Sequence, residues 1–154
     1  MNKLETYQLI EEKIKALLSK EDDWVSAMAT VACELQHGFD YFHWTGFYRM
    51  VDERTLKIGP YQGGHGCLSI DISRGVCARA AREQTTQLVG DVRMLKDHIA
   101  CSHETRSEIV VPICSKTKTM AVLDVDSNKK DAFDEIDKKK LEDICDFLSR
   151  KFFC

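Results

Sequence analysis

The sequence predicts an α+β fold in which helices pack against a mainly antiparallel sheet of about six strands. Apolar residues recur at helical spacing near both ends of the chain and once in its middle. Two pairs of apolar segments are each joined by a short polar turn, which is typical of β-hairpins. Because hairpin connections outnumber helical crossovers, we expect the strands to pair antiparallel.

A single domain spanning residues 1–154 is expected, because no repeat, low-complexity tract or Pro/Gly/Ser-rich linker divides the chain. The composition is 44% hydrophobic and 31% charged, as in ordinary globular proteins. The net charge of −3 argues against a nucleic-acid-binding surface. The polar start lacks the apolar core of a signal peptide, and the aliphatic runs are too short to cross a bilayer. We therefore expect a cytoplasmic protein without nucleic-acid or membrane partners.

Four helices are predicted from apolar spacing and from residues that can cap a helix. The predicted helices are residues 7–18, the segment from the cap Asp22 or Asp23 to Gly38, residues 75–83, and the segment from the cap Asp134 through Phe152. Their apolar positions define one buried stripe each, so every helix should pack against the sheet or against another helix.

The strands are predicted from alternating or continuous apolar residues bounded by turns. They cover residues 41–50, 55–58, 68–72, 86–89, 108–114 and 120–125. A glycine-rich loop is expected over residues 59–66 and a long, partly irregular loop over residues 90–105. Loops of that length are often functional, so we expect a pocket between these two loops and the sheet.

Three cysteines lie close together in the sequence and are followed by an isolated acid at the start of an apolar strand. These residues are Cys67, Cys77, Cys101 and Glu108. Cysteines are often simply buried in cores, but a thiol group beside a carboxyl group is also typical of sulfur redox chemistry. The chain has seven cysteines, an odd number, and no Cys-x-x-Cys pair. In a reducing compartment, any disulfide should therefore be transient and catalytic.

The other cysteines are assigned to packing or to the free terminus. Cys33, Cys114 and Cys145 lie on apolar faces of predicted elements, and Cys154 ends the chain. Three histidines, at positions 65, 98 and 103, flank the thiols and raise the alternative of zinc. The thiols are 10 and 24 positions apart, without the tight pairs of structural zinc sites, so we predict no metal and no cofactor.

Several of these segments together closely resemble one family, the free methionine-(R)-sulfoxide reductases, which are single GAF domains. The likeness extends over about residues 5–150 and rests on these motifs in order: Trp44-Thr45-Gly46-Phe47-Tyr48, Leu56-x-Ile58-Gly59-Pro60-Tyr61-Gln62-Gly63, Gly75-Val76-Cys77, Asp91-Val92, His98-Ile99-Ala100-Cys101, Arg106-Ser107-Glu108-Ile109-Val110-Val111-Pro112 and Val122-Leu123-Asp124-Val125-Asp126-Ser127. The chain departs from the family pattern before Cys67, where His65-Gly66 replaces the usual Pro-Ala, and also directly after Cys77 and Cys101.

The resemblance implies a GAF-like fold with a buried pocket for one free amino acid. It implies reduction of free L-methionine-(R)-sulfoxide to methionine, with regeneration of the enzyme by thioredoxin. It also makes a homodimer plausible. The family's functional positions correspond here to three thiols, three acids and one aromatic residue: Cys67, Cys77 and Cys101; Glu108, Asp124 and Asp126; and Trp44.

For the thiols, we expect Cys101 to attack the sulfoxide sulfur and to become a sulfenic acid. Cys67 is the first choice to condense with it to a disulfide, and Cys77 is the second. The reverse assignment, with Cys77 as the nucleophile, stays open from the sequence.

For the acids, three neighbouring carboxyl groups cannot all ionise easily, so at least one should keep its proton near neutral pH. We expect Glu108 to be the proton donor, and Asp124 and Asp126 to divide between the sulfoxide oxygen and the substrate ammonium group. Trp44 and Tyr48 could form an aromatic wall for the S-methyl group. Backbone N–H groups of residues 90–101 could hold the substrate carboxylate.

Two other interpretations of the same residues remain. A GAF domain can act as a non-catalytic sensor that binds a small molecule or registers oxidation. Alternatively, the thiols could be structural and the pocket could have no ligand. The sensor is the main alternative to the enzyme.

Overall fold

The computed structural model describes residues 1–99 and 101–154. Its elements are, in order, α1 (Lys3–Leu17), α2 (Trp24–Gly38), β1 (Trp44–Met50), β2 (Thr55–Gln62), β3 (Ser69–Asp71), α3 (Val76–Glu83), β4 (Gln87–Val89), the 3₁₀ turn η1 (Val92–Met94), β5 (Ser107–Cys114), β6 (Thr119–Ser127) and α4 (Glu135–Phe152). The predicted α+β architecture with a six-stranded sheet and four helices is confirmed. No helix in these residues is long and apolar enough to cross a membrane.

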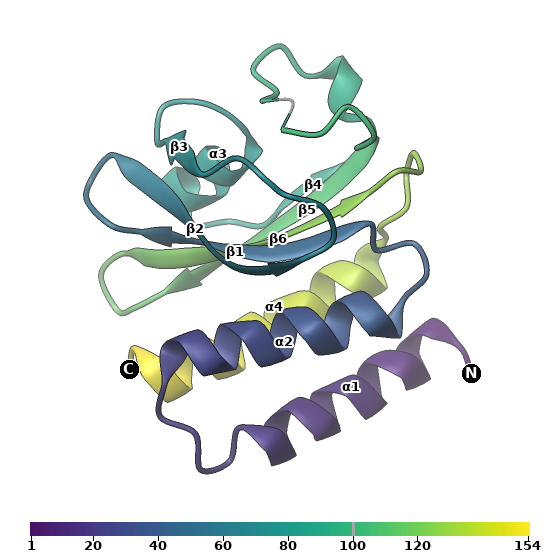
Figure 1. Cartoon of the computed structure of the whole chain (residues 1–154), viewed down its shortest axis with the longest axis vertical. Helices are drawn as coiled ribbons and strands as arrows, with labels where there is room; N and C mark the ends of the chain where they lie inside the picture. The colour runs from purple at the N-terminus through teal and green to yellow at the C-terminus, as the bar shows by residue number, and fades with distance from the viewer. Residues whose placement is uncertain (100) are drawn as a thin grey trace.

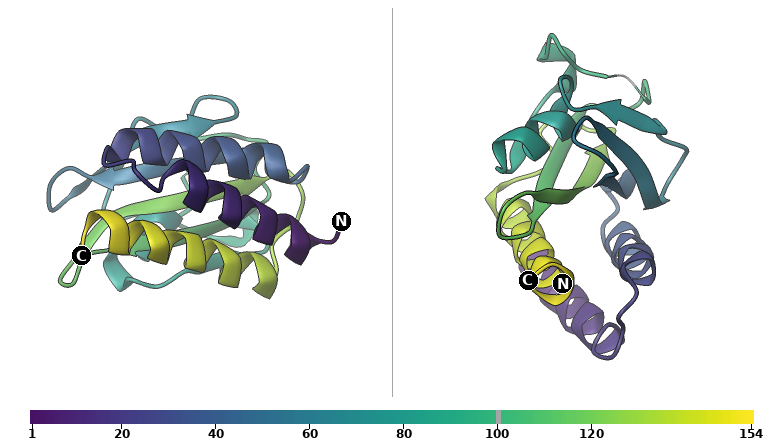
Figure 2. Two further views of the ribbon diagram at one scale, coloured as in Figure 1. Left: turned by 90° about the horizontal axis from the view of Figure 1, so that it is seen from below. Right: turned by 90° about the vertical axis from the view of Figure 1, so that its left-hand side faces the viewer.

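All neighbouring strands of the sheet run antiparallel, in the order β3-β2-β1-β6-β5-β4. The helices α2 and α4 cover one face of this sheet, and α1 packs beneath both of them (Figure 1). The short helix α3 lies on the other face, on the same side as the loop that carries η1 (Figure 1). Figure 2 shows the three long helices side by side when the molecule is seen from below.

The two faces of the sheet bury two separate apolar cores, because successive side chains of a strand point in opposite directions. On the helical face, Phe47, Ile109, Leu123 and Val125 pack against α1, α2 and α4. The second core lies between the sheet and α3 and includes Trp44, Tyr48, Cys77, Val110 and Val122. The sheet is thus covered on both faces, and only the α3 side carries the predicted site residues.

Helix boundaries were predicted well where a single side chain caps the helix. The carboxylates of Asp23 and Asp134 accept hydrogen bonds from backbone N–H groups at the starts of α2 and α4, as expected. By contrast, α1 begins at Lys3 and not at residue 7, because Asn2 and Glu5 form a reciprocal capping box. Those residues are polar, so hydrophobic periodicity did not reveal them.

Strand boundaries needed more correction. The predicted first strand, residues 41–50, begins only at Trp44. The predicted second strand, residues 55–58, continues to Gln62 because Tyr61 and Gln62 pair with Gly46 and Thr45 of β1. The beginning of the predicted glycine-rich loop is therefore strand.

The predicted strand over residues 68–72 shrinks to the three residues of β3. Leu68, expected to alternate with Ile70 on the buried face, lies outside the strand and is 68% exposed, whereas Ile70 is buried. The loop predicted over residues 90–105 contains η1, and its residue Ala100 lies outside the described part of the chain.

Candidate active site

The predicted acids and aromatic residues lie on one face of the sheet. On β6, Asp124 and Asp126 are two positions apart, so both point toward the α3 side while Val125 points to the helices. Glu108 of β5 and Trp44 of β1 both pair with Asp126, one from each side. The β5–β6 hairpin and the distant strand β1 therefore bring two acids and an indole into one row.

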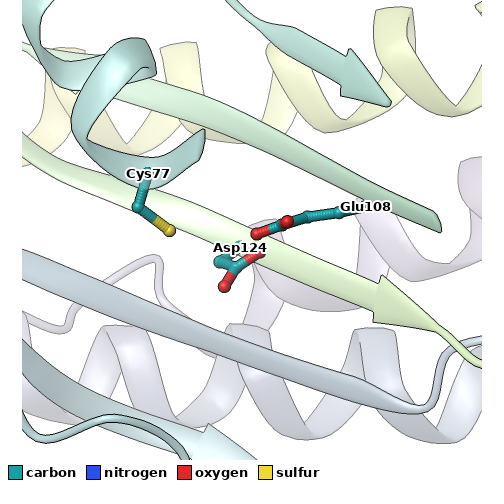
Figure 3. Close-up of side chains that lie close together, drawn as sticks. All are labelled: Cys77, Glu108 and Asp124. Carbon is teal, nitrogen blue, oxygen red and sulfur yellow. The ribbon is translucent and has the colours of Figure 1, made fainter. Parts of the chain in front are cut away.

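The helix α3 places Cys77 directly over these acids. Gly75 precedes the helix with a φ of +96°, a conformation that glycine adopts at no steric cost. The Cys77 side chain then points down toward Asp124, as Figure 3 shows, and Glu108 points toward the same carboxyl group. The Cys77 sulfur and one carboxyl oxygen each of Glu108 and Asp124 all lie within 4.8 Å of one another.

The other two predicted thiols form a disulfide. Cys67 and Cys101 are 34 positions apart in sequence, and their Cα atoms are 5.3 Å apart, a normal distance for this bond. Cys67 follows the turn after β2, whereas Cys101 belongs to the long loop between β4 and β5. Cys77 is free and only 4% exposed.

A cavity of about 70 Å³ lies between this face of the sheet, the start of α3 and the two loops. Such a volume is several times that needed for one water molecule. Its lining contains seven of the eight predicted site residues, together with residues of the loops, of β3 and of the start of α3: Trp44, Tyr48, Cys77, Cys101, Glu108, Asp124 and Asp126; and His43, Gly64, His65, Gly66, Ile70, Gly75, Val76, His98, Ile99, Ser102 and Thr105. The eighth, Cys67, is not among the lining residues but is bonded to Cys101, which is.

Burial keeps protons on the acids. Removal from water raises the pKa of Asp124 well above its ordinary value, and the charges of Asp126 and Glu108 raise it further. Burial followed by the charge of Glu108 raises the pKa of Asp126 in the same way, against hydrogen bonds from Asp124 and Thr105. Burial also raises the pKa of Glu108, partly offset by a hydrogen bond with Asp124. These directions agree with the expectation that at least one carboxyl group of the cluster keeps its proton.

The Cys77 thiol is held neutral by the same surroundings. Burial raises its pKa well above the ordinary thiol value, and the neighbouring charges of Asp124, Glu108 and Asp126 act in the same direction. The thiolate is the nucleophilic form of cysteine, so this position suits a proton donor better than an attacking group.

Two carboxyl oxygens of the acids that line the cavity are buried without a protein partner. Among residues 1–99 and 101–154, Oδ1 of Asp124 and Oδ1 of Asp126 are buried and receive no hydrogen bond from protein groups. Buried polar atoms in native proteins are nearly always paired, so these oxygens are available to a bound donor. A small molecule with a protonated amine or a hydroxyl group would satisfy them.

Trp44 and Tyr48 form one wall of the cavity. The Trp44 indole N–H donates to the carbonyl oxygen of Gly64 at 2.7 Å, and the ring stacks on Tyr61 with centroids 5.3 Å apart. The Tyr48 ring also stacks near Trp44, at a centroid distance of 6.0 Å. Burial raises the pKa of Tyr48, so its hydroxyl stays protonated. The wall is thus aromatic, rigid and uncharged.

Replacing Gly46 by alanine is expected to disrupt this wall. An added Cβ would lie closer than 3.0 Å to both the Trp44 ring and Cβ of Tyr61, which is fixed to its strand. We expect Gly46→Ala to lower the free energy of unfolding by about 1–3 kcal/mol and to change the tryptophan fluorescence. Gly64→Ala is the matched control, because nothing lies within 4 Å of its added Cβ. Equal stabilities of the two variants in urea would contradict this account.

The loop that carries Cys101 is attached to the rest of the site by polar contacts that the sequence did not reveal. Arg79 of α3 donates to both carboxyl oxygens of Asp97, at 3.1 and 3.0 Å. Nε2 of His43, directly before β1, lies 3.0 Å from a carboxyl oxygen of Glu104. No spacing or motif links these pairs, because each joins segments that only the folded chain brings together.

The residues flanking the thiols were considered as zinc ligands from the sequence. His65 and His98 do line the cavity, and burial lowers the pKa of His98. Within the described part of the chain, the possible metal-ligating atoms that lie within 4.8 Å of one another belong to different residues, namely Cys77, Glu108 and Asp124. Each of these groups would have to be deprotonated before it could bind a cation, whereas burial stabilises its protonated form. That the site uses no metal stays a prediction.

The fold and this site define the class of the protein, a GAF domain, since the model of that family matches residues 21–150. The chain is 40% identical to GAF domain-containing protein A of Dictyostelium discoideum, over 96% of this chain and 92% of that protein. It is 35% identical to the free methionine-R-sulfoxide reductase of Saccharomyces cerevisiae, over 97% of this chain and 87% of that enzyme.

Among solved structures, the free methionine-R-sulfoxide reductase of Neisseria meningitidis in complex with its substrate superimposes with a TM-score of 0.94. The two sequences are 38% identical, and the alignment covers 99% of this chain and 91% of that one. The chain belongs to the free methionine-(R)-sulfoxide reductase family of GAF-domain proteins, a family of oxidoreductases.

Proposed function

We propose that this protein reduces free L-methionine-(R)-sulfoxide to L-methionine, as its relatives' names indicate for them. One observation carries the proposal: a small cavity is lined by the Cys101 end of a disulfide, by the buried acids Glu108 and Asp124, and by the partly buried Asp126. Sulfoxide reduction by a thiol needs a sulfur nucleophile and a proton donor on the same enclosed substrate. The whole chain, residues 1–154, would act as one catalytic domain.

In the first step, the Cys101 thiolate attacks the sulfoxide sulfur while a carboxylic acid protonates the sulfoxide oxygen. The oxygen passes to the enzyme, so that methionine leaves and Cys101 becomes a sulfenic acid. The substrate sulfur is reduced and the Cys101 sulfur is oxidised by two electrons. Glu108 is the proposed donor; burial raises the pKa of its carboxyl group, as it does for Asp124 and Asp126.

In the second step, a thiol displaces the sulfenic hydroxyl group and water leaves. Cys67 is the proposed resolving residue, since its sulfur is bonded to that of Cys101 in the folded chain. The neutral, buried Cys77 fits a supporting role beside Asp124 better than a role in the disulfide. If Cys77 were the nucleophile instead, it would need to lose its proton among three acids.

Recognition of the free amino acid would follow from charge and enclosure. The unpaired oxygens of Asp124 and Asp126 could accept hydrogen bonds from the substrate ammonium group or its protonated sulfoxide. Trp44 and Tyr48 would enclose the S-methyl group, and backbone N–H groups of the loop over residues 90–101 would hold the carboxylate. A peptide-bound residue lacks the charged ammonium and brings backbone on both sides, so it should be rejected.

Thioredoxin is the proposed reductant of the resulting disulfide, in a cytoplasm that keeps such proteins reduced. The overall balance is one sulfoxide and one reduced thioredoxin consumed for each methionine, water and oxidised thioredoxin formed.

No metal or organic cofactor is needed in this scheme. A homodimer is proposed only from the likeness to the family.

The decisive assay supplies free methionine-(R)-sulfoxide with thioredoxin, thioredoxin reductase and NADPH. We expect NADPH consumption and methionine formation in equal amounts, with the (S)-sulfoxide and N-acetylated sulfoxide as poor substrates and no effect of a metal chelator. Tight binding of the sulfoxide without any methionine formed would favour a sensor. Neither binding nor turnover would favour structural thiols.

A further inference from the structure

In this structure, the bond to Cys67 fixes the position of Cys101. In the proposed cycle, however, Cys101 attacks the sulfoxide as a free thiolate, after that bond has been reduced. Rapid attack requires the two reacting atoms to be held about 3–3.5 Å apart in the correct orientation. Contacts other than the disulfide must therefore place Cys101 at the cavity when it reacts.

The segment that carries Cys101 begins and ends at one place beside the start of β5. The Val92 N–H donates to the carbonyl oxygen of Arg106 at 2.8 Å, and Nη2 of Arg106 lies 3.4 Å from a carboxyl oxygen of Asp91. Cys101 follows Val92 by nine positions and precedes Arg106 by five. These contacts fix the two ends of the segment, so they do not determine where the sulfur of Cys101 lies.

An ion pair attaches this segment to α3 close to Cys101. Nη2 of Arg79 donates hydrogen bonds to both carboxyl oxygens of Asp97, at 3.1 and 3.0 Å. The two side chains are 28% and 35% exposed, so the contact is partly shielded from water and salt. Partial burial raises the pKa of Asp97, but the charge and hydrogen bonds of Arg79 outweigh it, and the pKa lies below its ordinary value. The pair is therefore charged near neutral pH.

Further contacts connect Asp97 to Cys101. Ile99 packs against the start of α3, so closely that a Cβ added to Gly75 would lie 3.0 Å from Cδ1 of Ile99. The carbonyl oxygen of Ile99 in turn accepts a hydrogen bond of 3.0 Å from the Cys101 N–H. Ile99 and Cys101 both line the cavity. A shift of Asp97 relative to α3 would therefore move both of them.

The attachment on the other side of Cys101 is weaker. Nε2 of His43 lies 3.0 Å from a carboxyl oxygen of Glu104, whose side chain is 71% exposed. Exposed pairs contribute little, and this one is charged only when the imidazole is protonated. Once the disulfide is open, the contact between Arg79 and Asp97 is thus the stronger of these two polar restraints on Cys101.

We propose that Arg79 is a positioning residue, whose ion pair with Asp97 holds Cys101 at the cavity while the Cys67–Cys101 bond is open. The inference rests on the proposed function, because it concerns the thiol that attacks the sulfoxide there. Arg79 does not line the cavity, so it acts through Asp97 and the residues that follow. Loss of the pair should widen the range of positions of the free thiol without removing any group from the cavity lining.

The first test measures this positioning without methionine sulfoxide. The protein is equilibrated with mixtures of reduced and oxidised glutathione, quenched in acid and alkylated, and the Cys67–Cys101 bond is quantified by peptide mapping. Each bond formed reduces one oxidised glutathione to two glutathione molecules. The bond itself restrains the segment, whereas the thiol form depends on the ion pair. We therefore expect Arg79→Gln to lower the equilibrium constant for bond formation about three- to tenfold. An unchanged constant would overturn the proposal.

A double-mutant cycle shows whether the pair, and not either residue separately, is responsible. We expect Asp97→Asn to match Arg79→Gln, and the double variant to be no worse than either single variant. Single effects that add in the double variant would overturn the proposal. The matched control is Arg150→Gln, which removes an ion pair of 3.2 Å with Asp146 on α4, across the sheet from the cavity (Figure 1). It should leave the equilibrium unchanged, and a shift as large as that of Arg79→Gln would contradict the inference.

The second test separates this inference from the proposed function. In a single turnover without reductant, at saturating sulfoxide, we expect Arg79→Gln to form methionine about tenfold more slowly than the wild type. Arg79→Lys, which keeps the charge, should be intermediate. A wild-type rate in Arg79→Gln would overturn the positioning role. A wild-type protein that forms no methionine would refute the proposed function alone, and the glutathione equilibrium would still decide whether Arg79 positions Cys101.

Discussion

Cys101→Ser is expected to abolish methionine formation, lowering kcat/KM for the sulfoxide by at least about 10³-fold, as removal of a covalent nucleophile does elsewhere. Serine keeps the size and polarity of the side chain but is a far weaker nucleophile toward sulfur. The measurement is a single turnover without reductant, in which methionine formed per protein molecule is counted. The wild-type protein should form about one methionine per molecule, and Cys101→Ser none.

Variants of the other cysteines show, in the same experiment, whether Cys101 or Cys77 is the nucleophile. Cys67→Ser should still form one methionine, because attack precedes resolution, but should then stop turning over with thioredoxin. Cys77→Ser should continue to turn over, since the disulfide joins Cys67 to Cys101. Cys33→Ser on α2 is the control for a partly buried cysteine outside the cavity. A full first turnover in Cys101→Ser together with none in Cys77→Ser would establish the reverse assignment.

Glu108→Gln is expected to lower kcat by about 10²–10⁴-fold, the usual contribution of general acid catalysis. Glutamine keeps the shape of the side chain and its hydrogen-bonding capacity but carries no acidic proton. Burial raises the pKa of Glu108, so the wild-type rate should fall as the pH rises through that raised value. The variant should lose this decline from its pH–rate profile. Profiles of the same shape in both proteins would exclude Glu108 as the donor.

Measuring the free energy of unfolding of both proteins distinguishes an effect of Glu108→Gln on catalysis from an effect on folding. Because the pKa of Glu108 is raised in the folded protein, its contribution to stability is fully present below the unfolded pKa. That contribution is lost as the pH rises through the folded pKa, and it is absent in Glu108→Gln. Urea unfolding should therefore show a weaker loss of stability toward high pH in the variant. Glu142→Gln, where the glutamate accepts a hydrogen bond from Thr86 outside the cavity, should change neither profile.

Local patterns predicted those features that depend on neighbours in sequence. Asp23 and Asp134 cap their own helices, so the starts of α2 and α4 could be read directly. The two-residue spacing of Asp124 and Asp126 in an apolar strand already requires both to point to one face. The motifs shared with the family added the identity of the thiols and the nature of the ligand, which spacing by itself did not provide.

Features that depend on pairing between distant segments could not be predicted in this way. Gly59 and Pro60 are turn formers by local preference, yet they lie within β2, where its pairing with β1 shifts register between Gly46 and Tyr48. The exposure of Leu68 follows from the shortness of β3 at the sheet edge. Neither fact has a local signal.

The sequence by itself determined the fold class, most of the helices and the set of reactive side chains, because periodicity, capping and residue chemistry are local properties. Only the tertiary structure decided that Cys101 is joined to Cys67, that the Cys77 sulfur lies within 4.8 Å of carboxyl oxygens of Glu108 and Asp124, and that these residues and Cys101 line one cavity. The physical reason is that proton affinity and access depend on burial and on charges nearby in space, which three strands, one helix and two loops create together.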